Sequence, residues 1–510
     1  MTAKGSDCMK TLLVYPKYPD SFWSFKHALK FIGVKAALPP LGLLTIAGML
    51  PEDWEKRLID MNVRKLKDED LRWADYVMIS AMSIQQDSTN DVIKRCRKLG
   101  VKIIAGGSLF TSEPERFPEV DHLVLNEGEI TLAAFLEDLE KGYPRHIYTT
   151  DQKPQLENTP VPLWELINMN DYSTMSIQFS RGCPYDCEFC DITALFGRKP
   201  RLKPTDKFIR ELDAIFKSGW RGGVFIVDDN FIGNKVRLKK ELLPAIIEWM
   251  GKNRNPFWFI TEASINLADD DQLLQLMQRA NFASVFIGIE TPDEESLQEC
   301  NKFHNINRDL ISSVKKIQNY GIQVSGGFIV GFDSDTPSIF DRQINFIQKS
   351  GIVTAMVGLL KAPVGTRLFD RLKKENRILP DTDFSGDNTD LSLNFVPKMN
   401  IQKLTNGYKK IVTTIYDPKP YYDRVMEFFK EFRPAKKKGL SMLRFCYVKG
   451  LFRAMVILGF LEKGRRHYWK FLMKTLVKYP RFFPEAITFA IYGFHFRKIF
   501  GSFPQPEGSS

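Results

Sequence analysis

Short apolar runs alternate with amphipathic segments through the first 150 residues, a pattern typical of a parallel α/β sheet. The apolar runs have strand length and fall at residues 11–15, 57–60, 76–80, 102–105 and 122–126. Helical periodicity fills three of the intervals, at residues 41–50, 87–99 and 130–141. Because parallel sheets bind ligands at the carboxyl ends of their strands, residues 1–150 are predicted to form a ligand-binding α/β domain.

A second alternation begins after residues 151–172, which contain three prolines and are predicted to be a linker. Its six strand-like runs lie at residues 176–180, 223–228, 257–262, 284–289, 324–330 and 354–360. Six βα units are too few to close an ordinary eight-unit barrel, so residues 173–380 are predicted to form an open or partial barrel. The strand pattern then ends, and residues 381–510 are predicted to be a basic, mainly helical C-terminal domain.

The composition indicates a globular protein and argues against a membrane-spanning or disulfide-rich one. The chain has 510 residues, 44% of them hydrophobic and 26% charged, which is typical of a globular protein of about three domains. No apolar run reaches the roughly 18 residues that a membrane-spanning helix needs. The first nine residues are polar, and seven Cys are too few for a disulfide scaffold, so we expect a cytoplasmic protein.

The positive charge is concentrated in the tail. Residues 401–510 contain 22 Lys and Arg against 7 Asp and Glu, a net charge of +15, whereas the first 400 residues carry −4. Four cations recur every four residues and form one stripe on a predicted helix, at Arg466, Lys470, Lys474 and Lys478. Apolar residues are expected on the opposite face, at Tyr468, Trp469, Leu472, Met473 and Leu476.

Two interpretations of this stripe stay open. The helix can lie on an anionic membrane surface as a peripheral contact, or it can pack on the barrel and leave a solvated cationic face. Nucleic-acid binding is a third interpretation, but no nucleic-acid-binding module is recognisable, and nucleic acid is not expected as a partner.

Three of the seven cysteines, Cys183, Cys187 and Cys190, fall within eight residues directly after the first strand of the second alternation. Thiolates this close together repel one another unless a cation holds them, so the cluster indicates metal ligation. A structural zinc site needs four ligands, and no fourth Cys or His lies near in sequence. A four-iron cluster can be held by three thiolates, which leaves one iron open. The remaining Cys8, Cys96, Cys300 and Cys446 are isolated and are predicted to be buried or incidental.

The Cys-x3-Cys-x2-Cys spacing at the start of six βα units resembles the radical S-adenosylmethionine superfamily. The resemblance implies a [4Fe-4S] cluster on the three cysteines and S-adenosylmethionine on the open iron. One electron from a donor such as flavodoxin or ferredoxin then cleaves that cofactor to a 5′-deoxyadenosyl radical. It also implies cofactor contacts before the last cysteine and near strand ends, at Phe189, Asp228, Asp229, Glu262, Ser264, Glu290 and Gly327. The family's usual Gly-Gly-Glu is replaced here by Asp228-Asp229-Asn230-Phe231, and a carboxylate at a strand end can instead be a helix cap or an ion-pair partner.

The first domain is similar to the cobalamin-binding domains that precede many such cores. The motifs are Leu38-Pro-Pro-Leu-Gly-Leu43, Ser80-Ala-Met-Ser83, Gly106-Gly107 and Asn126-Glu-Gly-Glu129. They imply a Rossmann-like, cobalamin (B12)-binding domain, with cofactor contacts at Gly42, Ser80, Gly106, Gly107 and Gly128. The Asp-x-His-x-x-Gly motif that supplies a lower His ligand is missing, so His is not expected on the lower face. The alternative is a domain that keeps the fold without cobalamin.

The order of the three parts resembles the subfamily that includes the hopanoid C-2 methylases. This implies an enzyme that methylates an unactivated carbon of a small hydrophobic substrate, of which a lipid is one candidate. An alternative is ring closure or rearrangement by the same radical without methyl transfer. A non-enzymatic alternative is an iron–sulfur electron-transfer or cobalamin-carrier protein, although a closed electron-transfer cluster usually has four cysteines. The motifs do not identify the substrate.

Overall fold

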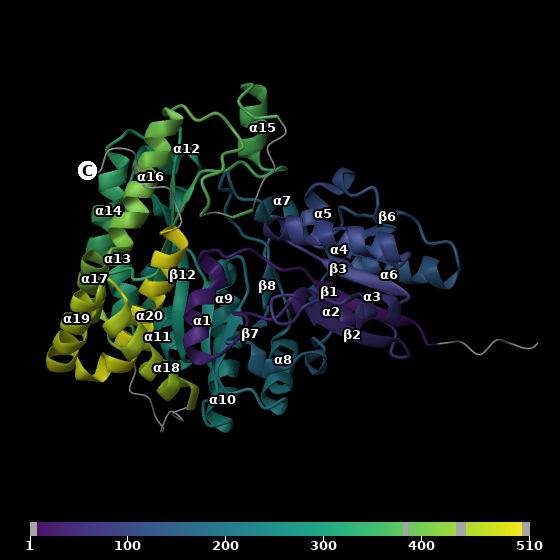
Figure 1. The fold of residues 1–510 in the computed structure, drawn as a ribbon, viewed down its shortest axis with the longest axis horizontal. Coiled ribbons are helices and arrows are strands. Elements are labelled where there is room, and N and C mark those ends of the chain that lie inside the picture. The colour runs from purple at the N-terminus through teal and green to yellow at the C-terminus, as the bar shows by residue number, and fades with distance from the viewer. Residues whose placement is uncertain (1–7, 381–385, 388, 435–444, 502–510) are drawn as a thin grey trace, which may run out of the picture.

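The computed structural model describes residues 8–380, 386–387, 389–434 and 445–501. Two parallel six-stranded sheets, one after the other along the chain, form its framework, and C-terminal helices pack on the second (Figure 1). This is the α/β architecture that the sequence predicts.

The first sheet has the order β2-β1-β3-β4-β5-β6 and is parallel throughout. Its strands are β1 (Lys10–Tyr15), β2 (Glu55–Asp60), β3 (Tyr76–Ser80), β4 (Lys102–Gly106), β5 (His122–Val124) and β6 (Ile147–Tyr148). The helices are α2 (Leu41–Met49), α3 (Asp68–Trp73), α4 (Gln86–Leu99), α5 (Ser108–Ser112) and α6 (Gly128–Glu140). The five predicted strands are confirmed, whereas β6 is too short for periodicity to reveal it.

Successive side chains along each strand point to opposite faces of this sheet, and both faces are buried. Leu12 and Val14 of β1 pack with α3, α4 and α5, whereas Leu13 packs with α2 and α6. Both faces are therefore covered by helices, as in doubly wound folds, and the carboxyl ends of the strands remain as the ligand-binding edge.

The second sheet has the order β7-β10-β11-β12-β13-β14, so its strands follow one another in space as they do in sequence. They are β7 (Thr174–Ile177), β10 (Gly223–Ile226), β11 (Trp258–Glu262), β12 (Phe282–Glu290), β13 (Gln323–Val330) and β14 (Ala355–Leu359). The covering helices are α8 (Thr205–Lys217), α9 (Lys235–Arg237), α10 (Leu243–Lys252), α11 (Asp271–Arg279), α12 (Glu294–Glu299), α13 (Leu310–Asn319), α14 (Ile339–Ser350) and α15 (Arg367–Lys374). All six predicted strands are confirmed. The edge strands β7 and β14 do not pair, so the barrel is partial.

One face of the second sheet stays open. The helix-covered face is fully buried, but Phe225, Ile260, Phe286 and Met356 are only half-buried and share the opposite face by register. Trp23, from the segment between β1 and α2, reaches this face. Its ring lies edge-on to Phe286 at 5.3 Å, and its Nε1 donates to Met356 Sδ at 3.0 Å.

The tail is helical, as predicted, and packs on the barrel near β14 (Figure 1). Its helices are α16 (Ile401–Tyr416), α17 (Pro418–Glu431), α18 (Phe445–Val456), α19 (Arg465–Lys478) and α20 (Phe483–Phe500), with a π-helical turn at Ile457–Leu461 after α18. Helices α18 and α20 also pack against α1 (Lys26–Ile32). In the turn just before α1, Phe22 stacks on Phe496 of α20 at 4.3 Å, and Phe22 O lies 3.0 Å from His495 Nε2. None of the described helices is long and apolar enough to cross a membrane.

Candidate functional site

The three clustered cysteines lie on the long loop that connects the two short strands of an antiparallel hairpin. The hairpin consists of β8 (Ser180–Arg181) and β9 (Arg201–Leu202), and the loop continues into α7 (Ile192–Phe196). Burial raises the pKa of all three thiols, and Cys183 and Cys187 each raise that of Cys190 further. The thiols therefore share one electrostatic environment, in which deprotonation needs a compensating cation.

The donor set fits an iron–sulfur cluster. Within the described ranges, no three His, Cys, Asp or Glu side chains converge closely enough to hold a single metal ion. A four-iron cluster does not need such convergence, because each thiolate binds a different iron. The three soft thiol donors on one partly buried loop are the ligands that such a cluster takes.

Two adjacent carboxylates hold the start of the cysteine loop. Asp228 is buried and accepts from Phe179 N at 2.7 Å and from Ser180 Oγ at 2.6 Å. Asp229 accepts from Gly182 N at 2.7 Å. Both oxygens of Asp228 are thus engaged by the chain itself, so its observed role is to position the loop. Its contact with a cofactor stays a prediction.

Glu262, at the end of β11, is a half-buried carboxyl with no hydrogen-bond partner among the described residues. Burial, followed by the charges of Asp229 and Asp228, raises its pKa to about 8. Burial likewise raises the pKa of Asp229 to about 7. A carboxylate pair with raised pKa values favours a cationic ligand, because a bound cation would stabilise the ionised forms. This fits the amino group of S-adenosylmethionine.

A chain of polar side chains links the third strand end to the cysteine loop. Asn230 Nδ2 donates to Ser264 Oγ at 3.3 Å, and Ser264 Oγ donates to Asn266 Oδ1 at 2.7 Å. Asn266 Nδ2 donates to the Oη of Tyr185 at 2.7 Å, and the ring of Tyr185 stacks on His304 at 3.7 Å. Ser264 is therefore linked to the loop, and its contact with a cofactor stays a prediction.

Glu290 forms a buried ion pair next to the cluster. It has a left-handed φ of 63° and accepts from Lys302 Nζ at 2.6 Å. Burial disfavours the charged form of Lys302, but Glu290 outweighs this and raises the pKa of its ammonium group. Burial raises the pKa of the Cys187 thiol and the charge of Lys302 opposes that shift, so the ion pair acts on a predicted cluster ligand.

The described isolated cysteines differ in exposure. Cys96 and Cys300 are buried and Cys8 is exposed, which agrees with the prediction that these cysteines are buried or incidental. Cys300 is not remote from the cluster, because its carbonyl accepts from Glu188 N at 2.9 Å and its thiol interacts electrostatically with Cys187. The side chain of Cys446 lies outside the described residues.

Glu188, an acidic residue of the cysteine loop, forms an ion pair with Arg371 of α15. Arg371 donates to both oxygens of Glu188, from Nε at 2.7 Å and from Nη2 at 3.0 Å, and its Nη1 donates to Asp333 Oδ2 at 3.1 Å. Phe189 packs beside this ion pair, with its ring 6.4 Å from that of Phe332. Sequence reasoning missed Glu188 and Arg371, because 183 residues separate the two partners.

Gly327 lies on the open face of β13. A Cβ at this position would lie 2.9 Å from Phe286 Cζ, so glycine is needed for Phe286 to keep its place. The observed role is therefore packing on the open face, and its contact with a cofactor stays a prediction.

The predicted cobalamin contacts gather at the carboxyl edge of the first sheet. Ser80 and Gly106 end adjacent strands, while Gly107, Gly128 and Gly42 lie at or near the starts of α5, α6 and α2. Gly107 has φ +94°, and a Cβ there would lie 2.9 Å from Ser80 Oγ. The glycines at this edge, here called the cobalamin cradle, let the chain's own segments approach one another closely. Their contact with cobalamin stays a prediction.

Neither His among residues 8–140 lies at this edge. His122 begins β5 at the opposite end of the sheet, and its Nδ1 lies 2.7 Å from Arg145 O. His27 lies on α1, with its ring 5.7 Å from that of His495.

The cradle and the cysteine loop are joined by ion pairs, here called the interdomain clamp. Glu127 accepts from Arg181 Nη1 at 2.7 Å and from Arg201 Nη2 at 2.8 Å. Glu129 accepts from Arg181 Nη2 at 2.8 Å. The four side chains are only 3–13% exposed. Burial opposes ionisation of Glu129, but Arg181 outweighs it and holds the pKa of that carboxyl below its usual range.

Comparison with known proteins assigns families to all three parts. The radical SAM superfamily matches residues 177–347, the B12 binding domain matches residues 31–136, and a domain of unknown function, DUF4070, matches residues 366–506. A methyltransferase of Synechocystis sp., itself uncharacterised, is 41% identical over 96% of this chain and 91% of its own length. The hopanoid C-2 methylase of Rhodopseudomonas palustris is 34% identical over 93% of this chain and 90% of its own.

A solved structure has the same overall fold. It is the radical S-adenosylmethionine methyltransferase TsrM from Kitasatospora setae, with cobalamin and a [4Fe-4S] cluster bound. It superposes with a TM-score of 0.61 at 13% identity and covers 92% of this chain and 99% of its own.

Proposed function

The chain belongs to the radical S-adenosylmethionine superfamily, among the members that carry a B12-binding domain, and from that membership we propose that it methylates an unactivated carbon of a hydrophobic substrate. Its cofactors are a [4Fe-4S] cluster, S-adenosylmethionine and cobalamin. When bound, these groups supply the electron, the radical and the methyl group.

The interdomain clamp is the observation that supports the proposal of methyl transfer. Glu127 immediately precedes Gly128 of the predicted cobalamin cradle, and Arg181 lies two residues before Cys183. Direct hydrogen bonds between them hold the two cofactor loops next to each other. A radical enzyme without methyl transfer does not need its cysteine loop to be fixed to a B12-binding edge. A reaction that uses both cofactors on one substrate does need it.

The chain's own residues provide positioning and charge. Asp228, Asp229 and the Arg371–Glu188 pair fix the backbone of the cysteine loop from three sides. Glu262 and Asp229 offer carboxylates to a cationic group, and Lys302 places a positive charge beside Cys187. These groups are largely buried, so their interactions are stronger than they would be in water.

The open face of the second sheet supports a hydrophobic substrate. Phe286 and Met356 project from this face, and Trp23 is 44% exposed although it touches both. Glu262 pairs in register with Phe286, which places the apolar surface beside the carboxylates expected to bind S-adenosylmethionine. The relative that acts on hopanoids, which are polycyclic lipids, supports the same class of substrate.

Enzymes of this superfamily need a reductant as well as a substrate. We propose a flavodoxin or a ferredoxin as the low-potential donor, and a peripheral contact with the membrane that holds a lipid substrate.

The test is anaerobic turnover of the reconstituted enzyme with S-adenosylmethionine, methylcobalamin, a reductant and a hopanoid. We expect 5′-deoxyadenosine and a product heavier by one methylene. Deoxyadenosine with an unmethylated, altered product would support ring closure or rearrangement instead. Absence of S-adenosylmethionine consumption by protein that carries its cluster would support a carrier. The Cys187→Ala variant is the control, since it lacks a cluster ligand.

A further inference from the structure

The exposed apolar side chains of this protein are concentrated on its C-terminal helices. Nineteen large hydrophobic residues of the described chain are exposed, and nine of them fall within residues 448–477. These nine come from α18, the π-helical turn and α19, and are called the apolar face here. Scattered single hydrophobics are normal on a protein surface, but a contiguous group marks a site of interaction.

The α18 part of the apolar face follows one helical stripe. Val448, Phe452, Met455 and Val456 are spaced four, three and one residues apart, so they lie on one side of the helix. Ala454 is buried on the other side, toward α1 and α20. None of the described residues therefore packs over the exposed stripe.

The α19 part differs from the sequence-based expectation. The buried side of α19 consists of Tyr468, Phe471, Leu472 and Thr475. Met473 and Leu476 were expected on this apolar side, but they are exposed and lie next to Lys474, as does Val477. The helix packs on the barrel and also presents a mixed apolar and cationic surface. The two interpretations of the stripe are therefore compatible.

The turn between the two helices carries the most prominent apolar side chains. Phe460 is 67% and Leu461 73% exposed. The turn is rigid, because Trp469 Nε1 donates to Gly459 O at 2.9 Å and a Cβ at Gly459 would lie 2.8 Å from the Trp469 ring. A rigid tip that exposes two bulky hydrophobics has the shape of a membrane-inserting element.

Cations that pair with no carboxylate of the described residues surround the apolar face, although Arg453 donates to the backbone carbonyl of Phe31. Residues 448–481 carry nine Lys and Arg against one Glu. In the part of the chain that the structure describes, no carboxylate pairs with Lys470, Lys474 or Lys478. Arg465 and Arg466 occupy the first turn of α19, where the helix dipole disfavours positive charge. An external anion would offset that cost.

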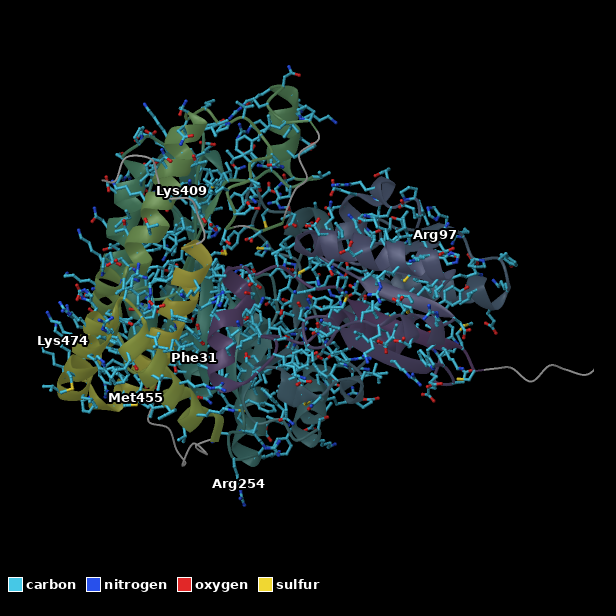
Figure 2. All side chains as sticks on the ribbon, in the orientation of Figure 1. Phe31, Arg97, Arg254, Lys409, Met455 and Lys474 are labelled. Atoms are coloured by element: carbon cyan, nitrogen blue, oxygen red, sulfur yellow. The ribbon has the colours of Figure 1, made fainter. Side chains whose placement is uncertain are left out.

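We propose that the apolar face and its surrounding cations dock on an anionic lipid bilayer, with Phe460 and Leu461 inserted between the headgroups. The combination of exposed hydrophobics and these cations fits a surface that is apolar inside and negatively charged outside. A second copy of this chain fits less well, since a symmetric contact would bring the two sets of lysines together. Figure 2 shows Met455 and Lys474 at the same end of the molecule, opposite Arg97 of the first domain.

The experiment is co-sedimentation of the cluster-loaded protein with vesicles, without substrate or turnover. Vesicles of phosphatidylglycerol and phosphatidylcholine are compared with phosphatidylcholine alone, across a salt series. We expect binding to the anionic vesicles at low salt that weakens as salt rises, because the Debye length falls from about 10 Å at 0.1 M to about 3 Å at 1 M. Equal binding to neutral vesicles, or none to either at low salt, would overturn the proposal.

Two variants separate the contributions of charge and insertion. Lys470→Gln/Lys474→Gln/Lys478→Gln should weaken binding to anionic vesicles roughly 100-fold, since each basic residue near such a surface contributes about a fivefold step and three such steps multiply. Phe460→Ser/Leu461→Ser should weaken it at least about tenfold and should also reduce the binding that remains at high salt. Both side chains are on the surface, so the cluster's absorption should be unchanged.

A control variant removes the same charge elsewhere. Lys65→Gln/Lys94→Gln/Lys98→Gln changes three exposed lysines of the first domain and should leave vesicle binding unchanged. If the control weakens binding as much as the α19 variant, net charge and not this face is responsible. If Phe460→Ser/Leu461→Ser abolishes a concentration-dependent dimer while vesicle binding is absent, the face is a contact between copies. Either result would contradict the proposal. Methyl transfer is not measured, so failure of the proposed activity would not affect the outcome.

Discussion

Removing one charge from the interdomain clamp should destabilise the protein far more than removing a similar charge from the surface. Glu127 is 3% exposed and receives hydrogen bonds from both Arg181 and Arg201, at 2.7 to 2.9 Å. In Glu127→Gln the shape is kept, but Arg201 loses its only described carboxylate and Arg181 keeps only Glu129. Breaking a buried ion pair by removing one partner costs about 3–5 kcal/mol, because the other charge stays desolvated.

The assay is urea unfolding of Glu127→Gln beside wild type, followed by circular dichroism and by the cluster's absorption. We expect the unfolding midpoint to fall by an amount that corresponds to about 3 kcal/mol, near the lower limit, since Arg201 keeps its bonds to the carbonyls of Pro154 and Phe196. Part of this loss should return in Glu127→Gln/Arg201→Gln, where neither charge remains unpaired.

Glu248→Gln provides the matched control. Glu248 pairs with Lys252 at 2.7 Å on the surface of α10, where both side chains are more than 60% exposed. The same substitution there should leave the midpoint unchanged within error. If Glu127→Gln behaves like Glu248→Gln, the clamp does not couple the two cofactor loops, and the main support for methyl transfer at this interface is lost.

Three further predictions concern the cofactor loops. Alanine at any one of the three cluster cysteines should abolish the cluster's visible absorption and deoxyadenosine formation, whereas Cys300→Ala should retain both; loss of the cluster in Cys300→Ala would make that buried thiol a ligand. In the apoprotein, Glu262 releases its proton near pH 4.5 when unfolded and near pH 8 when folded. Stability should therefore fall as pH rises between these values, more steeply in wild type than in Glu262→Gln, and identical urea midpoints across this range would contradict the burial argument. Gly107→Ala should lower the free energy of unfolding by about 1–3 kcal/mol, because Gly107 has φ +94° and no room for a Cβ. It should also weaken cobalamin binding in an absorption titration, and unchanged binding would show that cobalamin does not use this cradle.

The sequence predicts most strands of the two six-stranded sheets, because each of these strands contains apolar residues that its sheet buries. The strand β6 was missed, because it is only two residues long. The grouping of the three cysteines on one loop also follows from their local spacing, whereas their ligation of the cluster stays a prediction. The ion pairs that hold the loops could not be predicted from the sequence. Arg181 pairs with Glu129 across 52 residues and Arg371 with Glu188 across 183, and no local pattern encodes such a pairing.

The orientation of α19 shows a second limit of sequence reasoning. Periodicity identifies an amphipathic helix by its contrast between apolar and polar faces. In α19 apolar residues occur on both sides, and Met473 lies between exposed cations. The buried face can then be recognised only from what packs on it, here Tyr422, which stacks on Phe471 at 4.7 Å.

The capture of α1 by α18 and α20 has a consequence for how the chain is made. Phe22 emerges early from the ribosome, but its stacking partner Phe496 is synthesised 474 residues later. At typical translation rates of about 5–20 residues per second, Phe22 waits at least about 24 s for this partner. During that interval α1 and the segment before it lack the helices that later cover them, and nascent chains that expose apolar surface are prone to aggregation. Production of this enzyme in a foreign host is therefore expected to depend on chaperones that bind the unfinished chain, and slower growth at low temperature would give this long-range contact time to form.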